Sequence, residues 1–260
     1  MIGNKPIKKH YISINKKFIL SITFAFIWLI ISIYFSLPWV HDLGVLTTPF
    51  IAVVIIAGIG YVPGLTNSFI IMSLLLDRQP KFKTIDPEVP ITIIIACYNE
   101  EETIANTLSY IKNQIYDGEI KVIVVDNAST DQTDQRSIEA GEELELNLQV
   151  IYAKEPGKFN ALNEALKVVE TDYVITLDAD TLLHKLAVKH VVSRILTAPA
   201  DTCAVAGSVL VRNSRQNLLA RLQEWEYFLG IASIKRMQGM YQGTLVAQGA
   251  FSLYTTDILK

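Results

Sequence analysis

The stretch TDYVITLDADTLL at 171–183 joins an apolar run to a pair of aspartates. The run YVITL at 173–177 has the length and composition of a buried strand. Alternate side chains of an extended chain share a face, so Asp178 and Asp180 are predicted to point the same way, with Cα atoms ~6.6 to 7 Å apart. Their repulsion is about 2 to 3 kcal/mol at an effective dielectric of ~20. We therefore expect water, a cationic side chain or a metal ion beside them.

Three more apolar runs of strand length precede this one, and segments with helical spacing separate them. The runs are ITIIIA at 91–96, IKVIVV at 120–125 and QVIYA at 149–153. Strands that are apolar throughout and alternate with helices predict an α/β fold, with a mostly parallel sheet covered by helices on both faces. Ligands of such sheets bind beyond the carboxyl ends of the strands. The sequences at those ends are CYNE at 97–100, DNASTD at 126–131, KEPGK at 154–158 and DADT at 178–181.

Two long apolar segments near the N-terminus predict transmembrane helices. Residues 18–37 and 49–76 carry no charged side chain, and each segment is long enough to cross a bilayer. The first segment is too long for the apolar part of a signal peptide, and no small-x-small cleavage site follows it. Pro63 and Gly64 predict a kink or break in the second. The predicted organisation is a basic arm (1–17), two transmembrane helices (18–76), a linker (77–89) and an α/β domain (90–260).

The distribution of charge predicts orientation and excludes one class of partner. Five lysines lie in the basic arm, and Arg78, Lys81 and Lys83 follow the second apolar segment, whereas residues 38–48 contain no Lys or Arg. By the positive-inside rule both ends are cytoplasmic. Acidic residues outnumber basic ones after residue 76, which argues against nucleic acid as a partner. Cys97 and Cys203 lack zinc-site spacing, and we expect each to be a small buried hydrophobe in a reducing compartment.

Four motifs taken together resemble the membrane-embedded family 2 glycosyltransferases, the group that contains the synthases of cellulose, chitin, hyaluronan and poly-N-acetylglucosamine. The motifs are IIIACYNEEETI, VIVVDNASTD, GKFNALNEAL and YVITLDADTLL, and the similarity runs from about Ile91 to Tyr254. The stretch that begins GSVLVRNSRQNLLARLQEWEYF at 207, followed by QGAFSLY at 248–254, is most similar to the poly-N-acetylglucosamine synthases. The resemblance implies a Rossmann-like GT-A fold, a multi-pass plasma-membrane protein and a cytoplasmic catalytic domain.

The same resemblance implies an activity and its partners. The expected reaction is inverting, processive transfer of a sugar, taken to be N-acetylglucosamine, from a UDP-sugar to a growing exopolysaccharide. The expected partners are the donor, the polysaccharide acceptor, the lipid bilayer and an accessory synthase subunit. Two alternatives stay open: a catalytically inactive membrane module that binds nucleotide sugar, and an enzyme that transfers one sugar to a lipid phosphate carrier.

Site residues carried over from the family fall at the predicted strand ends. Ala96, Tyr98 and Glu100 are expected against the uracil and Asp126 against the uridine. Many relatives have a glycine in the loop after this aspartate; here Asn127, which tolerates unusual backbone angles, is expected to make the turn.

The remaining carried-over residues concern the phosphates and the acceptor. Lys158 is expected near the diphosphate or uridine, Asp178 near the donor sugar or ribose, and Asp180 on a Mg²⁺ or Mn²⁺ ion. Asp178 and Asp180 are thus the expected catalytic pair, and the divalent ion is the expected positive partner of both. The acceptor is expected beside four consecutive residues: Gln248, Gly249, Ala250 and Phe251.

Two family motifs are missing from the sequence. Neither the Thr-Glu-Asp motif, which carries the general base, nor the Gln-x-x-Arg-Trp motif occurs. We therefore expect the chain to be the front part of a longer enzyme that supplies donor binding. The triplet Thr255, Thr256 and Asp257 is interpreted as the start of a helix rather than as the base. Residues 216–240 are predicted to form a helix that either packs on the protein or lies on the membrane.

Overall fold

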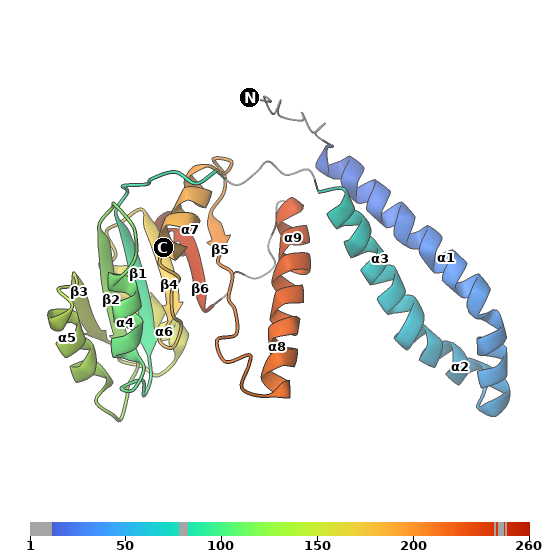
Figure 1. Cartoon of the computed structure of the whole chain (residues 1–260), viewed down its shortest axis with the longest axis horizontal. Helices are drawn as coiled ribbons and strands as arrows, with labels where there is room; N and C mark the ends of the chain where they lie inside the picture. The colour runs from blue at the N-terminus through green and yellow to red at the C-terminus, as the bar shows by residue number, and fades with distance from the viewer. Residues whose placement is uncertain (1–11, 78–82, 242, 244–246, 248) are drawn as a thin grey trace. The chain divides into compact units, whose positions relative to one another are not determined.

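The computed structural model describes residues 12–77, 83–241, 243, 247 and 249–260, and it divides into two compact units (Figure 1). One unit comprises Met1–Pro80 and Leu210–Leu245, and the other comprises Lys81–Val209 and Val246–Lys260. Most of the basic arm, Arg78 and Lys81 lie outside the described residues. The predicted orientation in a membrane therefore stays a prediction.

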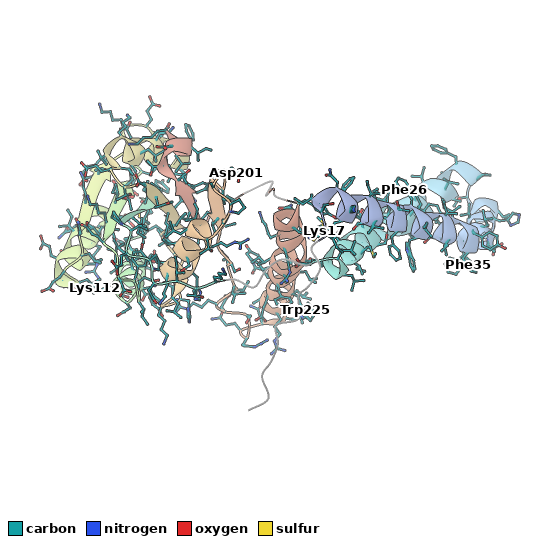
Figure 2. The ribbon with its side chains drawn as sticks, turned by 90° about the horizontal axis from the view of Figure 1, so that it is seen from above. Lys17, Phe26, Phe35, Lys112, Asp201 and Trp225 are labelled. Atoms are coloured by element: carbon teal, nitrogen blue, oxygen red, sulfur yellow. The ribbon has the colours of Figure 1, made fainter. Side chains whose placement is uncertain are left out.

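The first unit contains two helical stretches that are long and apolar enough to cross a membrane. They are α1 (Ile14–Leu46) and a stretch made of α2 (Pro49–Ile56), a π-helical turn (Ala57–Tyr61) and α3 (Val62–Leu75). Side chains such as Phe26 and Phe35 project from α1 and are 51% and 71% exposed (Figure 2). Exposed apolar surface of this kind on a long helix suits a lipid environment.

These helices differ in detail from the prediction. Helix α1 continues through Pro38 to Leu46, so the expected loop at 38–48 is mostly helical. The expected break at Pro63 and Gly64 is instead a π-helical turn just before them, with Pro63 in the first turn of α3. A π-helical turn absorbs a local change of helix direction without ending the helix.

A third helical segment of the first unit packs against α3. It consists of α8 (Leu218–Leu229), a π-helical turn (Gly230–Lys235) and α9 (Arg236–Met240). Arg236 Nε donates to Asp77 Oδ2 at 2.7 Å, and the hydroxyls of Tyr241 and Ser73 lie 2.8 Å apart. On α8, in contrast, Leu222 and Trp225 are 57% and 63% exposed. The α9 end is thus a packing helix, whereas α8 presents an apolar face.

The second unit contains a six-stranded sheet in the order β3-β2-β1-β4-β6-β5. The strands are β1 (Ile91–Cys97), β2 (Ile120–Asp126), β3 (Leu148–Tyr152), β4 (Tyr173–Asp178), β5 (Ala204–Ala206) and β6 (Phe251–Thr255). The first four strands pair in parallel, and β6 is antiparallel to both β4 and β5. This confirms the predicted α/β fold with a mostly parallel sheet.

Helices cover both faces of the sheet because its central strands are apolar on both sides. Ile93 and Ile95 of β1 belong to a core cluster with α4, α5 and α7, whereas Ile94 faces a cluster with α6. All three isoleucines are at most 1% exposed. The helices are α4 (Ile104–Lys112), α5 (Thr133–Glu143), α6 (Lys158–Val168), α7 (Ala187–Leu196) and the short α10 (Thr256–Leu259).

The strand order places a crevice between β1 and β4. From β1 the chain moves outward to β2 and β3, and it then returns to the other side of β1 as β4. Loops that leave neighbouring strands in opposite directions at such a switch point leave a crevice between them. The acidic strand end of β4 therefore faces the loop that follows β1.

The triplet at 255–257 starts a helix, as predicted. Thr255 occupies the N-cap position of α10, although its side chain makes no capping hydrogen bond. The next hydroxyl, Thr256 Oγ1, donates to the Thr171 carbonyl at 2.5 Å. The triplet therefore ties α10 to the start of β4, at the opposite end of that strand from Asp178.

Candidate functional site

A pocket of about 290 Å³ lies at the carboxyl ends of β1 and β4. Six of the predicted site residues line it: Ala96, Tyr98, Glu100, Lys158, Asp178 and Asp180. Three residues without a predicted pocket role complete the lining: Cys97, Asn127 and Ala179. The structure thus gathers side chains from four separate segments of the sequence in one hollow.

Asp178 and Asp180 share the pocket for a different reason from the one expected. Strand β4 ends at Asp178, and Ala179 and Asp180 form a turn, so the alternation of an extended strand does not apply to the pair. Asp178 N donates to Ala250 O at 3.1 Å, and Asp178 O accepts from Thr181 N at 3.0 Å. The turn presents Asp180, which is exposed, beside the partly buried Asp178.

A lysine supplies positive charge beside the aspartates. Lys158 is the first residue of α6, and its Nζ forms an ion pair with Asp178 Oδ1. Gly157 before it has φ +131°, and a Cβ there would lie 3.1 Å from the Phe159 ring. Any other residue at 157 would therefore be strained. Gly157 N donates to Asn127 Oδ1 at 2.8 Å, which ties this loop to the end of β2.

Asp126 lies next to the pocket without lining it. It pairs with Cys97 in the sheet register, is 6% exposed, and its Oδ1 accepts from Ser129 N at 3.2 Å. Its predicted contact with the uridine stays a prediction. The prediction that Asn127 makes the turn is wrong, because Asn127 N donates to Cys97 O at 2.9 Å and continues the strand pattern. Ala128 makes the turn instead, with φ +61°.

Reciprocal hydrogen bonds tie the loop after β1 to the loop after β2. Asn99, with φ +56°, donates from N to Ser129 Oγ at 3.1 Å, and its Oδ1 accepts from Thr130 N at 2.8 Å. Glu101 N donates to Asp131 Oδ2 at 3.2 Å. Residues 99–101 and 129–131 thus form a clasp that holds the segment carrying Tyr98 and Glu100.

Hydrogen bonds lower the pKa of Asp131 within this clasp. Partial burial raises the pKa of its carboxyl, but hydrogen bonds from the Thr133 side chain and from the N–H groups of Glu101 and Thr133 outweigh burial and lower the pKa. The carboxylate form is therefore the one that closes the loops. The clasp was missed from the sequence; its only signal is the series of short polar side chains, which favour turns, in CYNE and DNASTD.

The two cysteines behave differently from each other. Cys97 borders the pocket although none of its surface is exposed. Burial, together with the charges of Glu100 and Asp126, raises the pKa of its thiol to about 12, so it is no nucleophile at neutral pH. Cys203 is exposed, which corrects the expectation that it is buried. It directly precedes the short edge strand β5, where little covers the chain.

Three of the four predicted acceptor residues are described, and they adjoin Lys158 and Asp178. A Cβ on Gly249 would lie 3.8 Å from Lys158 Nζ, and the Ala250 carbonyl accepts from Asp178 N. Phe251 is only 6% exposed, so its side chain serves the core. Gln248 lies outside the described residues. The acceptor role of this segment stays a prediction.

The carboxylates of the pocket suit a divalent ion only if a bound ligand completes the coordination of that ion. Among the described residues no group of three His, Cys, Asp or Glu side chains could hold a metal. Asp178 and Asp180 supply hard carboxylate oxygens, and Mg²⁺ is commonly bound by one or two carboxylates with phosphate oxygens completing its coordination. The residues therefore fit an ion that arrives with a phosphate-bearing molecule.

Residues 92–260 match the sequence profile of the family described as Glycosyl transferase family 2. The match covers well over half of the chain, including the whole sheet except Ile91 and every residue that lines the pocket. The chain belongs to glycosyl transferase family 2. The resemblance noted in the sequence is thereby confirmed.

Two curated proteins show how this chain compares with known sequences. It is 32% identical over 179 residues to the poly-beta-1,6-N-acetyl-D-glucosamine synthase of Staphylococcus aureus (strain COL), covering 69% of this chain and 42% of the relative. The Staphylococcus epidermidis synthase of the same name is 32% identical over 170 residues, covering 65% and 40%. The chain thus spans about two fifths of the length of these relatives.

The fold of the chain is that of known glycosyltransferases. The mannosyltransferase PcManGT from Pyrobaculum calidifontis, solved in complex with GDP-Man and Mn²⁺, superposes with a TM-score of 0.57 at 23% identity, covering 74% of this chain and 52% of that one. At this identity the likeness concerns the fold, which agrees with the predicted GT-A architecture.

Proposed function

We propose that this chain supplies the donor-binding part of a membrane-anchored glycosyltransferase that takes its sugar from a UDP-sugar. The observation that carries the proposal is the pocket at the β1/β4 switch point, where Lys158, Asp178 and Asp180 converge. A lysine beside two carboxylates suits a metal–diphosphate, because the ammonium attracts phosphate oxygens and the carboxylates hold the cation. The 32% identity to poly-N-acetylglucosamine synthases supports N-acetylglucosamine as the sugar and an exopolysaccharide as the acceptor.

In this proposal each residue of the pocket has a separate task. Tyr98, which is 57% exposed, and Ala96 offer a surface for the base, and Glu100 offers a carboxylate beside it. Lys158 contributes a point charge toward the diphosphate, while Asp180 and Asp178 contribute oxygen ligands. A bound Mg²⁺ or Mn²⁺ ion would supply Lewis-acid stabilisation of the charge that develops on the leaving diphosphate. In this mechanism the general base is not one of the residues that line the pocket.

The apolar helices give the proposal its location. Helix α1 and the stretch Pro49–Leu75 are each long enough to span a bilayer. With the lysines on the flanking segments, they support a multi-pass membrane protein whose second unit is cytoplasmic. In that compartment the nucleotide sugar is available to the pocket.

The test is binding of UDP to the full chain in detergent, measured by titration calorimetry with and without Mn²⁺ or Mg²⁺. We expect binding only with a divalent ion, and at least about tenfold weaker binding by Asp180→Asn, because one charged oxygen ligand is lost. Asp201→Asn is the matched control, because Asp201 is an exposed carboxylate outside the pocket (Figure 2). Metal-independent binding, or unchanged binding by Asp180→Asn, would contradict the proposal.

Donor and activity require a second experiment. Competition against UDP by UDP-N-acetylglucosamine, UDP-glucose and GDP-mannose ranks the donors, and we expect the first to compete best. Radiolabelled UDP-N-acetylglucosamine then distinguishes the alternatives. Label in a polymer supports a synthase, label in lipid indicates transfer to a lipid carrier, and binding without turnover indicates a donor-binding part that does not act alone.

A further inference from the structure

The turn that carries Asp180 is held by a threonine from a helix that contributes nothing to the pocket lining. Thr107 Oγ1 of α4 donates to the Ala179 carbonyl at 2.6 Å. Thr107 is 0% exposed and Ala179 is 4% exposed, so the bond is closed off from water. The Ala179 carbonyl belongs to the peptide unit that connects Ala179 to Asp180. Fixing the direction of this carbonyl therefore fixes the peptide plane that contains the Asp180 N and Cα atoms.

This hydrogen bond acts where the sheet no longer orders the chain. The last ladder residue of β4 is Asp178, whose N–H is already used on Ala250 O. Beyond it, Thr181 N closes the turn onto Asp178 O at 3.0 Å. The hydroxyl of Thr107 supplies an anchor to the middle of the turn, between the two carboxylates. Without it the buried carbonyl would need another donor, and the peptide would have to rotate to reach one.

The hydrogen bond of Thr107 differs from the local bond that a hydroxyl in a helix usually makes. Such a local bond is made by Ser137 of α5 and by Thr197, the exposed C-cap residue of α7, which each donate to the carbonyl four residues earlier at 2.7 Å. This is the usual local bond of a serine or threonine in or at the end of a helix. Thr107 instead donates to a different segment, as Ser193 of α7 and Thr256 of α10 also do, and it does so from a core-facing position between Ile104 and Ile111.

We infer that Thr107 is a positioning residue that sets the direction of Asp180 relative to Asp178, and thereby the affinity of the pocket for a divalent ion with a nucleoside diphosphate. The inference deepens the proposed function and rests on it. Residues that orient metal ligands without contacting the metal commonly change metal affinity by roughly 10- to 100-fold when they are altered. A hydroxyl that only filled the core would change stability and leave the metal requirement unaltered.

A graded series at position 107 tests the inference. Thr107→Val keeps the shape and removes the donor, Thr107→Ser keeps the hydroxyl, and Thr107→Cys offers a weak donor. The measured quantity is the Mn²⁺ concentration that gives half-maximal UDP binding. We expect it to rise roughly tenfold in Thr107→Val, to rise less in Thr107→Cys and to stay near wild type in Thr107→Ser. The serine variant keeps a hydroxyl donor and the cysteine variant keeps a weaker thiol donor. The order of their Mn²⁺ requirements therefore tests the inference even if Thr107→Val folds poorly.

Thr92→Val is the matched control. Thr92 is also a buried threonine, at 1% exposure, and its hydroxyl lies 2.8 Å from that of Thr171, at the amino end of the sheet away from the pocket. We expect this variant to lose stability without altering the Mn²⁺ dependence. An unchanged Mn²⁺ dependence in Thr107→Val, or an equal shift in Thr92→Val, would overturn the inference.

A second readout keeps the inference separate from the proposed function. Amide hydrogen exchange at Thr181 reports the turn directly and needs no ligand. We expect faster exchange there in Thr107→Val and no change in Thr92→Val, and equal exchange in both would refute the positioning role. If the wild-type protein does not bind UDP with Mn²⁺, the proposed function fails, and the exchange result still decides whether Thr107 orders the turn.

Discussion

Lys158 and Asp178 form an ion pair that joins the start of α6 to the end of β4. The pair brings a positive charge to a turn that carries two carboxylates. Both partners are partly exposed, so the pair itself adds little to stability. Its importance lies in the pocket, where the Lys158 ammonium can leave Asp178 and bind a phosphate group instead. The sequence predicted water, a cationic side chain or a metal ion beside the aspartates, and in the structure Lys158 pairs with Asp178.

Replacing Lys158 with methionine should weaken nucleotide binding and leave the fold almost unaltered. Loss of a charge-assisted contact to phosphate predicts a roughly tenfold lower affinity for UDP in the presence of Mn²⁺. The unfolding free energy should change by less than about 1 kcal/mol, because the ion pair with Asp178 is solvent-exposed. Calorimetric titration with UDP and urea unfolding measure the two effects.

The control for this change is Lys154→Met. Lys154 is an exposed lysine in the loop between β3 and α6 and does not line the pocket. Lys154→Met therefore removes the same charge from a position just before α6. Equal losses of affinity in the two variants would show that only net charge matters and would contradict a specific contact from Lys158.

The fold was predictable where its signal is local. The strands β1 to β4 are mostly apolar runs. The segments between them carry apolar residues at helical spacing, so the pattern of apolar residues indicates a parallel sheet. Strands β5 and β6 carry no such signal, since Ala204–Ala206 is three residues long and Phe251–Thr255 is paired through distant contacts. The first transmembrane helix was predicted to end at residue 37, with the uncharged run, but α1 continues through Pro38 to Leu46.

The site was predictable by residue type and less so by geometry. Strand ends of a parallel sheet converge, which is why Lys158, Asp178 and Asp180 were expected together and lie together. The backbone of each loop was not predictable, since Asn127 was expected to turn and Ala128 does so. Side chains that act on other segments, such as Thr107, have only one signal in the sequence: a hydroxyl at a core-facing position of an apolar helix.

Asp131→Asn should loosen the clasp between residues 99–101 and 129–131. Asparagine replaces one carboxylate oxygen with a donor, which cannot accept from the N–H of Glu101 or Thr133. We expect faster amide exchange at both residues and several-fold weaker UDP binding, because the loop carries Tyr98 and Glu100. Asp117→Asn, which alters an exposed aspartate outside the pocket, should change neither quantity.

The clasp should also depend on pH in a defined direction. The pKa of Asp131 is lowered in the folded protein, so its contribution is complete above the ordinary value of 3.8 and is lost as the pH falls below it. Exchange protection at Glu101, corrected for the intrinsic rate, should therefore hold at pH 5 in the wild type. Protection that fades between pH 7 and pH 5 would show that another group controls the loops.

Gly207→Ala should destabilise the second unit and disturb the pocket. A Cβ at Gly207 would overlap the Phe251 ring, and Gly207 N donates to Phe251 O at 3.0 Å. The Phe251 ring is buried, so β6 must shift, and with it Ala250, whose carbonyl holds Asp178 N. We expect a loss of about 1 to 3 kcal/mol in unfolding free energy and weaker UDP binding.

Gly239→Ala separates this clash from the general effect of replacing glycine. A Cβ at Gly239, in α9, would meet nothing within 4 Å. Alanine should leave stability equal or raise it by about 0.4 to 1 kcal/mol, since it restricts the unfolded chain. Equal behaviour of the two variants in urea unfolding would refute the close approach of Gly207 to Phe251.

The two thiols should react at very different rates. Cys203 is exposed, whereas Cys97 is buried and the pKa of its thiol is raised to about 12, from an ordinary value of 9.0. At pH 8 iodoacetamide should therefore modify the native wild type once and the Cys203→Ser protein not at all, until urea unfolds it. Mass spectrometry counts the adducts. Modification of native Cys203→Ser at the rate of an unfolded thiol would contradict the burial of Cys97.

The same thiol should make stability fall at high pH. Folding favours the neutral form of Cys97, so its contribution is complete below pH 9 and is lost as the pH rises from about 9 towards 12, where only the unfolded chain ionises this group. Within that window the cost approaches about 1.4 kcal/mol per pH unit. Tyrosines and lysines titrate there too, so the measurement is the difference in unfolding free energy between the wild type and Cys97→Ala. That difference should shrink with rising pH, because alanine cannot ionise, and a constant difference from pH 8 to pH 11 would show that the thiol titrates alike in both states.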